Sequence, residues 1–311
     1  MTRHVFVDYS NQVLDENKIK EMMANGIEAV IMRSGYVTSN DAAVALQVPI
    51  LRKCGMPFGL YRYWVTGYSE SLQATALLHD GEAWNPACVV GDAEDRHNYF
   101  TWATALPEDI STSYELMATQ VDARTARPYL NYSGPWFPAA WSLRMTSWLK
   151  YQWFWGAEYP HGWDQHTPEL WPKTYKDLIS KLHALTFPTD PLYPTWAAWQ
   201  AGGNMRVAEI DRLLDFSVVD RDDVWAWMFL GGPMPALPST PPIVPGKTLP
   251  YLVNNETGLY VRSAPDANAA KLRWLADRTP LAVVKILQGW AQIALPLDGY
   301  VSENYIKPVV K

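Results

Sequence analysis

Short apolar runs alternate with longer amphipathic stretches along the first 230 residues. The apolar runs lie at 4–9, 28–35, 57–64, 87–94, 127–134, 152–159 and 194–200. Residues 17–26, 42–55, 70–84 and 112–125 carry apolar side chains at helical spacing, and the first two stretches end on a glycine. This alternation predicts βα units and a mainly parallel sheet. Over about 230 residues it favours a closed or nearly closed β/α barrel.

The pattern changes at residues 231–250, which hold seven prolines and no helical period. Such a composition predicts a semi-rigid, extended linker. Residues 251–311 then consist of short strands divided by turns, which predicts a small β-barrel. We therefore expect a β/α barrel domain over 1–230, a linker over 231–250 and a small all-β domain over 251–311.

The composition adds one positive indication and several exclusions. Sixteen Trp and seventeen Tyr are a large excess, and flat aromatic faces pack well on the apolar faces of sugar rings. Most single rings are expected in the core, but the excess as a whole favours a carbohydrate ligand. A net charge of −6 argues against a nucleic-acid partner. Cys54 and Cys88 are flanked by apolar sequence, so we expect buried free thiols rather than a disulfide.

The first residues, MTRHVFVDYS, contain no apolar signal-peptide region. No stretch reaches the roughly 18 uncharged apolar residues that a membrane span needs. We therefore expect synthesis in a cytoplasm without an export signal, and no insertion into a membrane.

The stretch VVGDAEDR, at 89–96, ends an apolar strand in acidic residues. Function in β/α barrels gathers at the carboxyl ends of strands. Asp92 and Glu94, at i and i+2, would share one face with Cα atoms about 6.6 Å apart. They would repel by roughly 3 kcal/mol, enough to hold one proton near neutral pH. Glycoside hydrolysis needs one protonated and one ionised carboxyl. The spacing alone does not exclude a solvated acidic loop or an N-cap cluster.

Seven short motifs follow one another in a recognisable order. They are VDYSNQ with Asp8, Ser10 and Gln12; RSGY at 33–36; GLYRY at 59–63; GDAED at 91–95; Trp155 with Tyr159; Trp199 with Gln200; and Asp211 in VAEIDRLLDF. Over residues 3–217 this order resembles glycoside hydrolase family 25, the muramidases typified by certain fungal and phage lysozymes.

The resemblance implies an irregular TIM-like β/α barrel that hydrolyses the β-1,4 bond between N-acetylmuramic acid and N-acetylglucosamine in bacterial peptidoglycan. It places Glu94 as general acid/base, Asp92 as the residue that assists the substrate's 2-acetamido group, and Asp8 and Asp211 as two further acids of the site. The substrate-binding residues expected with them are Arg33, Tyr36, Tyr61, Tyr63, Tyr132, Trp155, Trp199 and Gln200. No metal or other cofactor is expected.

The sequence departs from the family pattern in two places. The third strand reads Tyr-Arg-Tyr where a His is common between the tyrosines, which we expect to alter the charge at the rim. The connection at 160–194 is long, and it either extends the sugar groove or decorates the barrel.

Residues 251–311 resemble a bacterial SH3-like domain through GLYVRSAP and GYVSENYI. Such a module would hold the enzyme on the cell wall, the alternative being a spacer or dimerisation unit.

Together these features suggest a monomeric muramidase of the phage endolysin kind, made in the cytoplasm and acting on the wall after release. Two alternatives stay open. One is a non-catalytic protein that binds cell-wall glycan, and the other is a glycosidase of the same fold that acts on another N-acetylated glycan. The carboxylate spacing does not decide between a retaining and an inverting reaction.

Overall fold

A computed structural model describes twelve stretches of the chain. They are residues 3–65, 68–93, 107–134, 152–164, 166–187, 196–206, 213–235, 249–255, 258–275, 280–287, 289–295 and 299–308. The chain divides into two compact units, Met1–Pro238 and Ser239–Lys311. The division falls within the proline-rich segment.

The first unit is built on a closed, mixed β-barrel. Its strands are β1 (His4–Tyr9), β2 (Ala29–Tyr36), β3 (Ser39–Asn40), β4 (Phe58–Tyr63), β5 (Val89–Asp92), β6 (Tyr129–Ser133), β7 (Phe154–Ala157), β8 (Trp196–Met205) and β9 (Leu214–Val219). The sheet order is β1-β9-β8-β7-β6-β5-β4-β2-β3, and β1 also pairs with β2 and so closes the ring. The irregular β/α barrel is confirmed. Its irregularity is β9, which is antiparallel to both β8 and β1.

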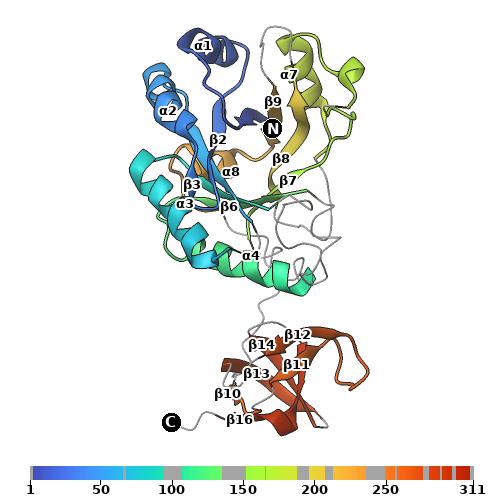
Figure 1. The fold of residues 1–311 in the computed structure, drawn as a ribbon. Coiled ribbons are helices and arrows are strands. Elements are labelled where there is room, and N and C mark those ends of the chain that lie inside the picture. Colours follow the sequence, from blue (N-terminus) through green and yellow to red (C-terminus); the bar gives the residue numbers. More distant parts are fainter. Residues whose placement is uncertain are drawn as a thin grey trace. The chain divides into compact units, whose positions relative to one another are not determined.

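Helices surround these strands (Figure 1). They are α1 (Glu16–Ala24), α2 (Ala42–Cys54), α3 (Glu70–Trp84), α4 (Pro107–Asp122), the 3-10 turn η1 (Pro168–Leu170), α7 (Tyr175–Ala184) and α8 (Asp222–Phe229). The Ser69 and Thr174 side chains cap α3 and α7 by accepting backbone N–H groups. Gly55 ends α2 in the left-handed conformation, with φ 71°, as the sequence predicts.

Alternate residues of the strands build two cores. Inward-facing residues such as Phe6, Ile31 and Val90 fill the barrel together with apolar residues of α8. Outward-facing residues such as Val7 and Val89 pack beneath the surrounding helices. The period of two along each strand therefore decides which side chains enter the barrel and which contact the helices.

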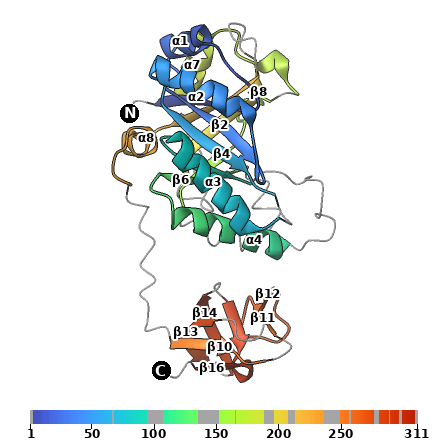
Figure 2. The same ribbon diagram turned by 60° about the vertical axis from the view of Figure 1, so that its left-hand side comes forward.

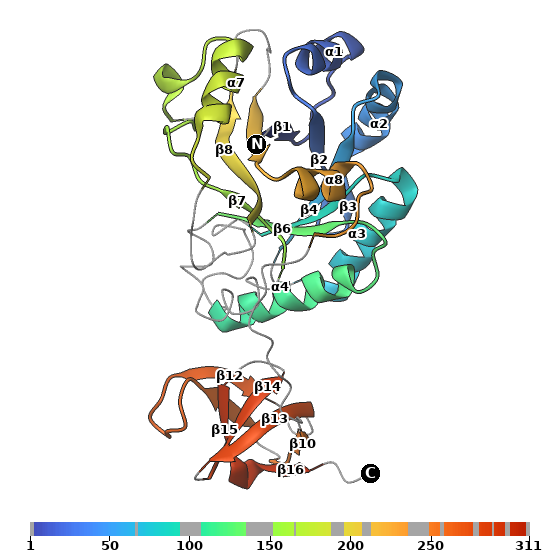
Figure 3. The same cartoon turned by 180° about the vertical axis from the view of Figure 1, so that it is seen from behind.

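Helix α8 lies beside the N-terminal end of β1 (Figures 2 and 3). The His4 ring stacks on Trp225, with centroids 4.6 Å apart. Its two ring nitrogens lie 2.9 Å from a Glu28 carboxylate oxygen and 3.2 Å from one of Asp222. Helix α8 therefore covers the end of the barrel where the parallel strands begin, and their carboxyl ends lie at the opposite end.

The described part of the long connection after β7 packs on the barrel. Trp163 is buried in the outer core with Leu178 and Leu182 of α7. The Gly203 N–H donates to Trp163 O at 2.9 Å and ties the connection to β8. These contacts favour a structural role for the connection.

Both cysteines are free thiols; Cys88 is buried and Cys54 is partly buried.

The second unit is a seven-stranded antiparallel sheet in the order β12-β11-β15-β14-β13-β10-β16. Its strands are β10 (Leu249–Val253), β11 (Leu259–Arg262), β12 (Lys271–Leu275), β13 (Pro280–Leu287), β14 (Trp290–Leu295), β15 (Gly299–Ser302) and β16 (Ile306–Pro308), with the 3-10 turn η2 (Glu303–Tyr305). It has a buried core of its own, including Val261, Ile293 and Val301. In the described ranges of the two units, no helix is both long and apolar enough to cross a membrane.

The interior core generates a stability prediction. Phe6 is fully buried, and its ring lies 5.2 Å from that of Trp155 and 5.7 Å from that of Phe229. Phe6→Ala should lower the free energy of unfolding by about 3–5 kcal/mol, because it leaves a cavity between the barrel and α8. Urea denaturation followed by fluorescence measures this. The control Leu72→Ala, at a side chain 60% exposed, should change it by less than about 0.5 kcal/mol. Equal effects of the two substitutions would contradict the interior packing.

Candidate active site

A small pocket lies at the carboxyl ends of the parallel strands. Its lining residues are Asp8, Tyr61, Asp92, Tyr132, Trp155 and Asp215. Most of them come two residues after a side chain of the interior core. Asp8 comes two residues after Phe6, and Asp92 two residues after Val90. Side chains at i and i+2 share a face of a strand, so the last inward-facing positions supply the lining.

Asp215 reaches the same end of the barrel by a different route. It is the second residue of β9, which runs antiparallel to its neighbours, so the start of β9 lies beside the end of β1. Asp8 and Asp215 are direct partners in this register. Two carboxylates from the first and last strands therefore face each other across the barrel's seam.

Gln200 on β8 joins this pair to the tyrosines. The Gln200 Nε2 atom lies 3.2 Å from both carboxylate oxygens of Asp8 and 3.5 Å from Asp215 Oδ2. The Tyr132 and Tyr159 hydroxyls donate to Gln200 Oε1 at 2.8 and 2.9 Å. Because both hydroxyls donate hydrogen bonds to the amide oxygen, the amide nitrogen faces the two carboxylates.

The Asp215 carboxyl holds its proton more tightly than an ordinary aspartic acid. Burial raises its pKa from 3.8 to about 6, although a hydrogen bond from the Asn204 backbone N–H and one with Asp8 act to lower it. The Asp8–Asp215 pair therefore carries a proton well into the mildly acidic range.

Asp92 and Arg33 bring opposite charges to the other side of the pocket. Asp92 is 2% exposed, and its register partners are Tyr63 on β4 and Tyr132 on β6. The Arg33 Nε donates to Asp41 Oδ2 at 2.7 Å. Burial opposes the charge on Arg33, but the hydrogen bond to Asp41 and the charges of neighbouring groups, Asp92 among them, raise the pKa of its guanidinium.

Aromatic rings lie in the pocket wall, at Tyr61, Tyr132 and Trp155, and beside it, at Tyr36 and Tyr63. Tyr132 packs on Trp155 with ring centroids 4.6 Å apart, and the Trp155 indole N–H donates to Ser217 Oγ at 3.1 Å. Tyr36 and Tyr63 stack at 5.5 Å with planes 21° apart, and both are half-buried. Such rings offer flat apolar faces with polar groups at their edges, which suits a sugar.

The structure brings together most of the residues expected in the site. Asp8, Tyr61, Asp92, Tyr132 and Trp155 line the pocket. Gln200 bonds to its carboxylates. Arg33 is the register partner of Tyr61, and Tyr36 that of Tyr63. Glu94 and Asp211 lie outside the described residues.

Two expectations need correction. Trp199 lies in the outer core, where its indole N–H donates to Glu158 O at 2.7 Å and its ring meets Phe187 edge-on. Because its neighbour Gln200 faces the barrel interior, Trp199 faces outward and does not line the pocket. Arg62, expected to alter the charge at the rim, is buried on the outer face of β4 and paired with Asp80.

Sequence reasoning missed Asp215, and it named Tyr159 in a motif without placing it among the site residues. The pattern LDFSVV contains the signal for Asp215: Asp215 and Ser217 alternate with apolar residues that face the outer core. Among the described residues, no group of three or more His, Cys, Asp or Glu side chains is arranged to hold a metal ion.

Comparisons with known proteins bear on the fold. No family model matches the sequence, and no curated protein does. Solved structures do match. A lysozyme from Streptomyces coelicolor is 15% identical, with a TM-score of 0.54 over 73% of this chain and 98% of that one. A muramidase from Acremonium alcalophilum is 14% identical, with a TM-score of 0.54 over 72% and 98%. A family 25 glycosyl hydrolase of Streptococcus pneumoniae is 16% identical, with a TM-score of 0.53 over 74% and 94%.

These neighbours define the class to which the barrel is similar. It has the fold of the lysozymes and muramidases of glycoside hydrolase family 25, over about 72% of the chain. At this level of identity the likeness shows the fold alone. The function must therefore be argued from the pocket.

The Asp215 carboxyl generates a prediction about stability and pH. Between pH 3.8 and about 6, the folded chain keeps a proton on Asp215 that the unfolded chain releases. The free energy of unfolding should therefore fall as pH rises through this window, by about 2–3 kcal/mol from this group. Asp215→Asn should remove that part of the slope, as measured by urea denaturation at a series of pH values. A slope as steep in Asp215→Asn as in the unchanged chain would show that Asp215 titrates normally.

Proposed function

We propose that the barrel is a muramidase that hydrolyses the β-1,4 bond between N-acetylmuramic acid and N-acetylglucosamine in bacterial peptidoglycan. The observation that carries this proposal is the convergence of Asp8, Asp92 and Asp215 in one pocket walled by tyrosine and tryptophan. The same fold occurs in structures described as a lysozyme and a muramidase.

The catalytic roles combine the sequence motif with the pocket. Glu94 follows Asp92 by two residues in GDAED, and we assign it as the general acid that protonates the leaving sugar oxygen. Asp92 assists the 2-acetamido group of the substrate as that group approaches the anomeric carbon. We assign Asp215, rather than Asp211, as the acid that joins Asp8.

The Asp8–Asp215 pair has a separate electrostatic role. Positive charge develops on the sugar ring as the glycosidic bond breaks. The buried Asp8 and the half-buried Asp215 together hold at least one negative charge in a fixed position, so they stabilise the positive charge on the sugar without rearranging. The Gln200 amide fixes the position, because it binds both carboxylates.

The sugar rings would rest on the aromatic walls. Tyr61, Tyr132 and Trp155 surround the bond to be cleaved, and the stacked pair Tyr36 and Tyr63 lies next to them along β2 and β4. Arg33 and Gln200 add polar contacts. Trp199 has no part in binding.

The second unit has the features of a wall-binding module. Tyr260, Trp274 and Tyr305 are between 42% and 50% exposed, and the first and last border a groove with Arg262. We assign this unit as an SH3-like domain that holds the enzyme on its polymer and raises its local concentration. The proposal includes a monomeric protein that acts on the wall after release, as a phage endolysin does.

Loss of the general acid tests the catalytic assignment. Glu94→Gln should lower the release of reducing ends from purified, N-acetylated cell walls by about 100- to 10,000-fold, because proton transfer typically contributes that much. Glu82→Gln, the same change at an exposed residue of α3, should leave the rate unchanged.

The other outcomes of that assay would each support one of the two alternative functions. An intact protein that binds walls but releases nothing would be a non-catalytic glycan-binding protein. Cleavage of another N-acetylated glycan but not of peptidoglycan would indicate a different substrate.

Co-sedimentation tests the second unit. Residues 239–311 form a compact unit with a buried core, so they can be studied alone. They should pellet with purified cell walls, and the chain cut after residue 238 should pellet less than the full chain. A second unit that stays in the supernatant would favour the spacer or dimerisation role.

A further inference from the structure

Strand β2 contains a β-bulge beside the pocket. Arg33 pairs with Tyr61 of β4, but the next pairs are Gly35 with Arg62 and Tyr36 with the residue after it. One residue of β2, Ser34, therefore has no partner on β4. Such an insertion redirects the side chains that follow it.

The bulge decides which residue near the end of β2 faces inward, next to the pocket. Ile31 belongs to the interior core, so Arg33 faces inward two residues later. In a regular strand the next inward position would be Gly35, which has no side chain. The extra residue brings Tyr36 inward instead, where its ring stacks on Tyr63. The aromatic pair at this side of the pocket therefore depends on the bulge.

Buried polar groups hold the bulged residue. Ser34 Oγ lies 3.1 Å from the Tyr61 carbonyl oxygen and 2.6 Å from Asp80 Oδ2 of helix α3. Ser34 and Asp80 are each only 2% exposed. The bulge is thus tied both to the neighbouring strand and to the helix outside it.

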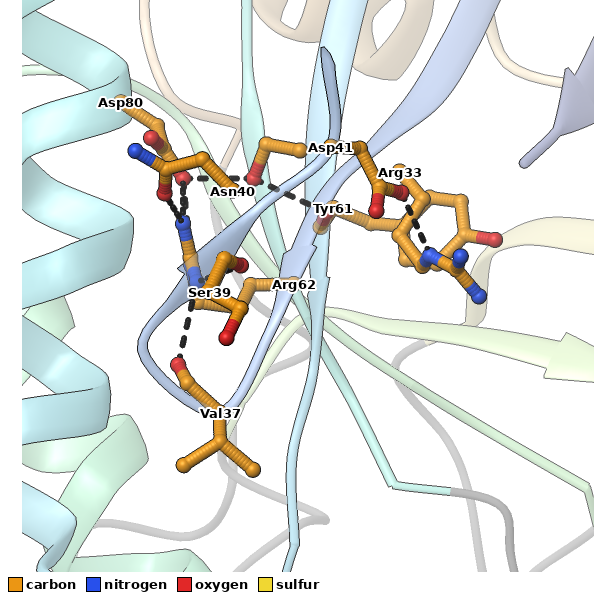
Figure 4. A network of polar contacts seen from close by, with 9 residues as sticks. Arg33, Val37, Ser39, Asn40, Asp41, Tyr61, Arg62 and Asp80 are labelled. Atoms are coloured by element: carbon orange, nitrogen blue, oxygen red, sulfur yellow. Dashed lines mark hydrogen bonds and ion pairs between the residues drawn. The ribbon is translucent and has the colours of Figure 1, made fainter. Parts of the chain in front are cut away.

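Arg62 completes this cluster and holds the turn after the bulge. Its Nε and Nη2 atoms lie 3.1 and 2.6 Å from Asp80 Oδ2. Its Nη1 donates to the carbonyls of Val37 and Ser39, both at 3.0 Å, and Nη2 also donates to Asn40 Oδ1 at 2.7 Å (Figure 4). A buried cation is unfavourable unless its donors are satisfied, and here every nitrogen of the guanidinium has an acceptor.

The same turn positions Arg33. The Asp41 N–H donates to Ser34 O at 2.9 Å, and its carboxylate accepts from Arg33 Nε at 2.7 Å. A side chain at Gly35 would place its Cβ 2.6 Å from Arg62 Nη1 and closer still to a carbonyl oxygen of the turn. Glycine is therefore required for the turn to approach the guanidinium.

We infer that Ser34, Arg62 and Asp80 are positioning residues for the sugar-binding side of the pocket. They do not line the pocket themselves. They fix the bulge and its turn, which present Tyr36 and, through Asp41, the Arg33 guanidinium. The inference rests on the proposed function for what is bound, but the structural part stands without it.

Hydrogen exchange tests the structural part without a ligand. The backbone N–H groups of Val37 and Asp41 bond across the bulge and turn, to Tyr63 O and Ser34 O. In Ser34→Ala they should exchange about tenfold faster, because the loss of one hydrogen bond weakens the closed form by that factor. Amides of β6 should be unaffected. Asp80→Asn, which keeps the shape of the side chain, should act in the same way.

Binding tests the functional part. The affinity of the full chain for a soluble N-acetylglucosamine oligomer, measured by calorimetry, should fall about fivefold in Ser34→Ala. On cell walls KM should rise while kcat stays within about twofold. Ser71→Ala, an exposed serine of α3, should change neither quantity. In a Tyr36→Ala background, Ser34→Ala should cost no further affinity, because its effect passes through that ring.

The outcomes separate the inference from the function. Unchanged exchange at Val37 and Asp41 in both Ser34→Ala and Asp80→Asn would overturn the inference. So would a loss of affinity that Ser34→Ala adds in full to that of Tyr36→Ala. A full chain that neither binds the oligomer nor cleaves walls would remove the proposed function, and the exchange result would still decide whether the cluster holds the bulge.

Discussion

Closure of the barrel by an antiparallel strand is the constraint on which the site depends. Because β9 runs against β1, the start of β9 meets the end of β1 and sets Asp215 opposite Asp8. Two carboxylates in register, Asp8 buried and Asp215 half-buried, cannot both ionise cheaply, and desolvation raises the pKa of Asp215 to about 6. Gln200 keeps this arrangement in place, because its amide donates to both carboxylates and accepts from two tyrosines.

Packing in the rest of the barrel offsets the free-energy cost of placing these carboxylates together. The interior is filled by aromatic and aliphatic side chains, and α8 packs against them at the far end. Asp8 and Asp92 lie at inward-facing positions where β1 and β5 end, and Asp215 lies near the start of the antiparallel β9. Within the barrel interior, the acidic side chains Asp8 and Asp92 therefore lie at the pocket, as expected of a site whose carboxyl groups must differ in protonation.

Much of this architecture could be predicted from periodicity. The first strand at 4–9 and the helix at 70–84 have the predicted bounds, because strong apolar patterns and clear ends define them. The residues of the site were harder to predict, because the register of each strand decides which side chains point into the barrel. The expectation for Trp199 was wrong because adjacent residues of a strand point to opposite faces of the sheet, and its neighbour Gln200 is the one that points inward. Asp215 was missed because the pattern predicts a mainly parallel sheet without showing which strand is antiparallel, and the antiparallel β9 brings its beginning to the pocket. The bulge at Ser34 leaves no trace in a pattern of apolar residues, so the burial of Arg62 was not foreseen.

The most direct test is a crystal structure of the Glu94→Gln protein with a soluble peptidoglycan fragment that contains the muramic acid–glucosamine linkage. We expect sugar rings across Tyr61, Tyr132 and Trp155, with the glycosidic oxygen beside residue 94 and the ring carbon to be attacked near Asp92. A fragment bound elsewhere on the barrel, with this pocket left to water, would contradict the central claim that the converging acids act on a glycan.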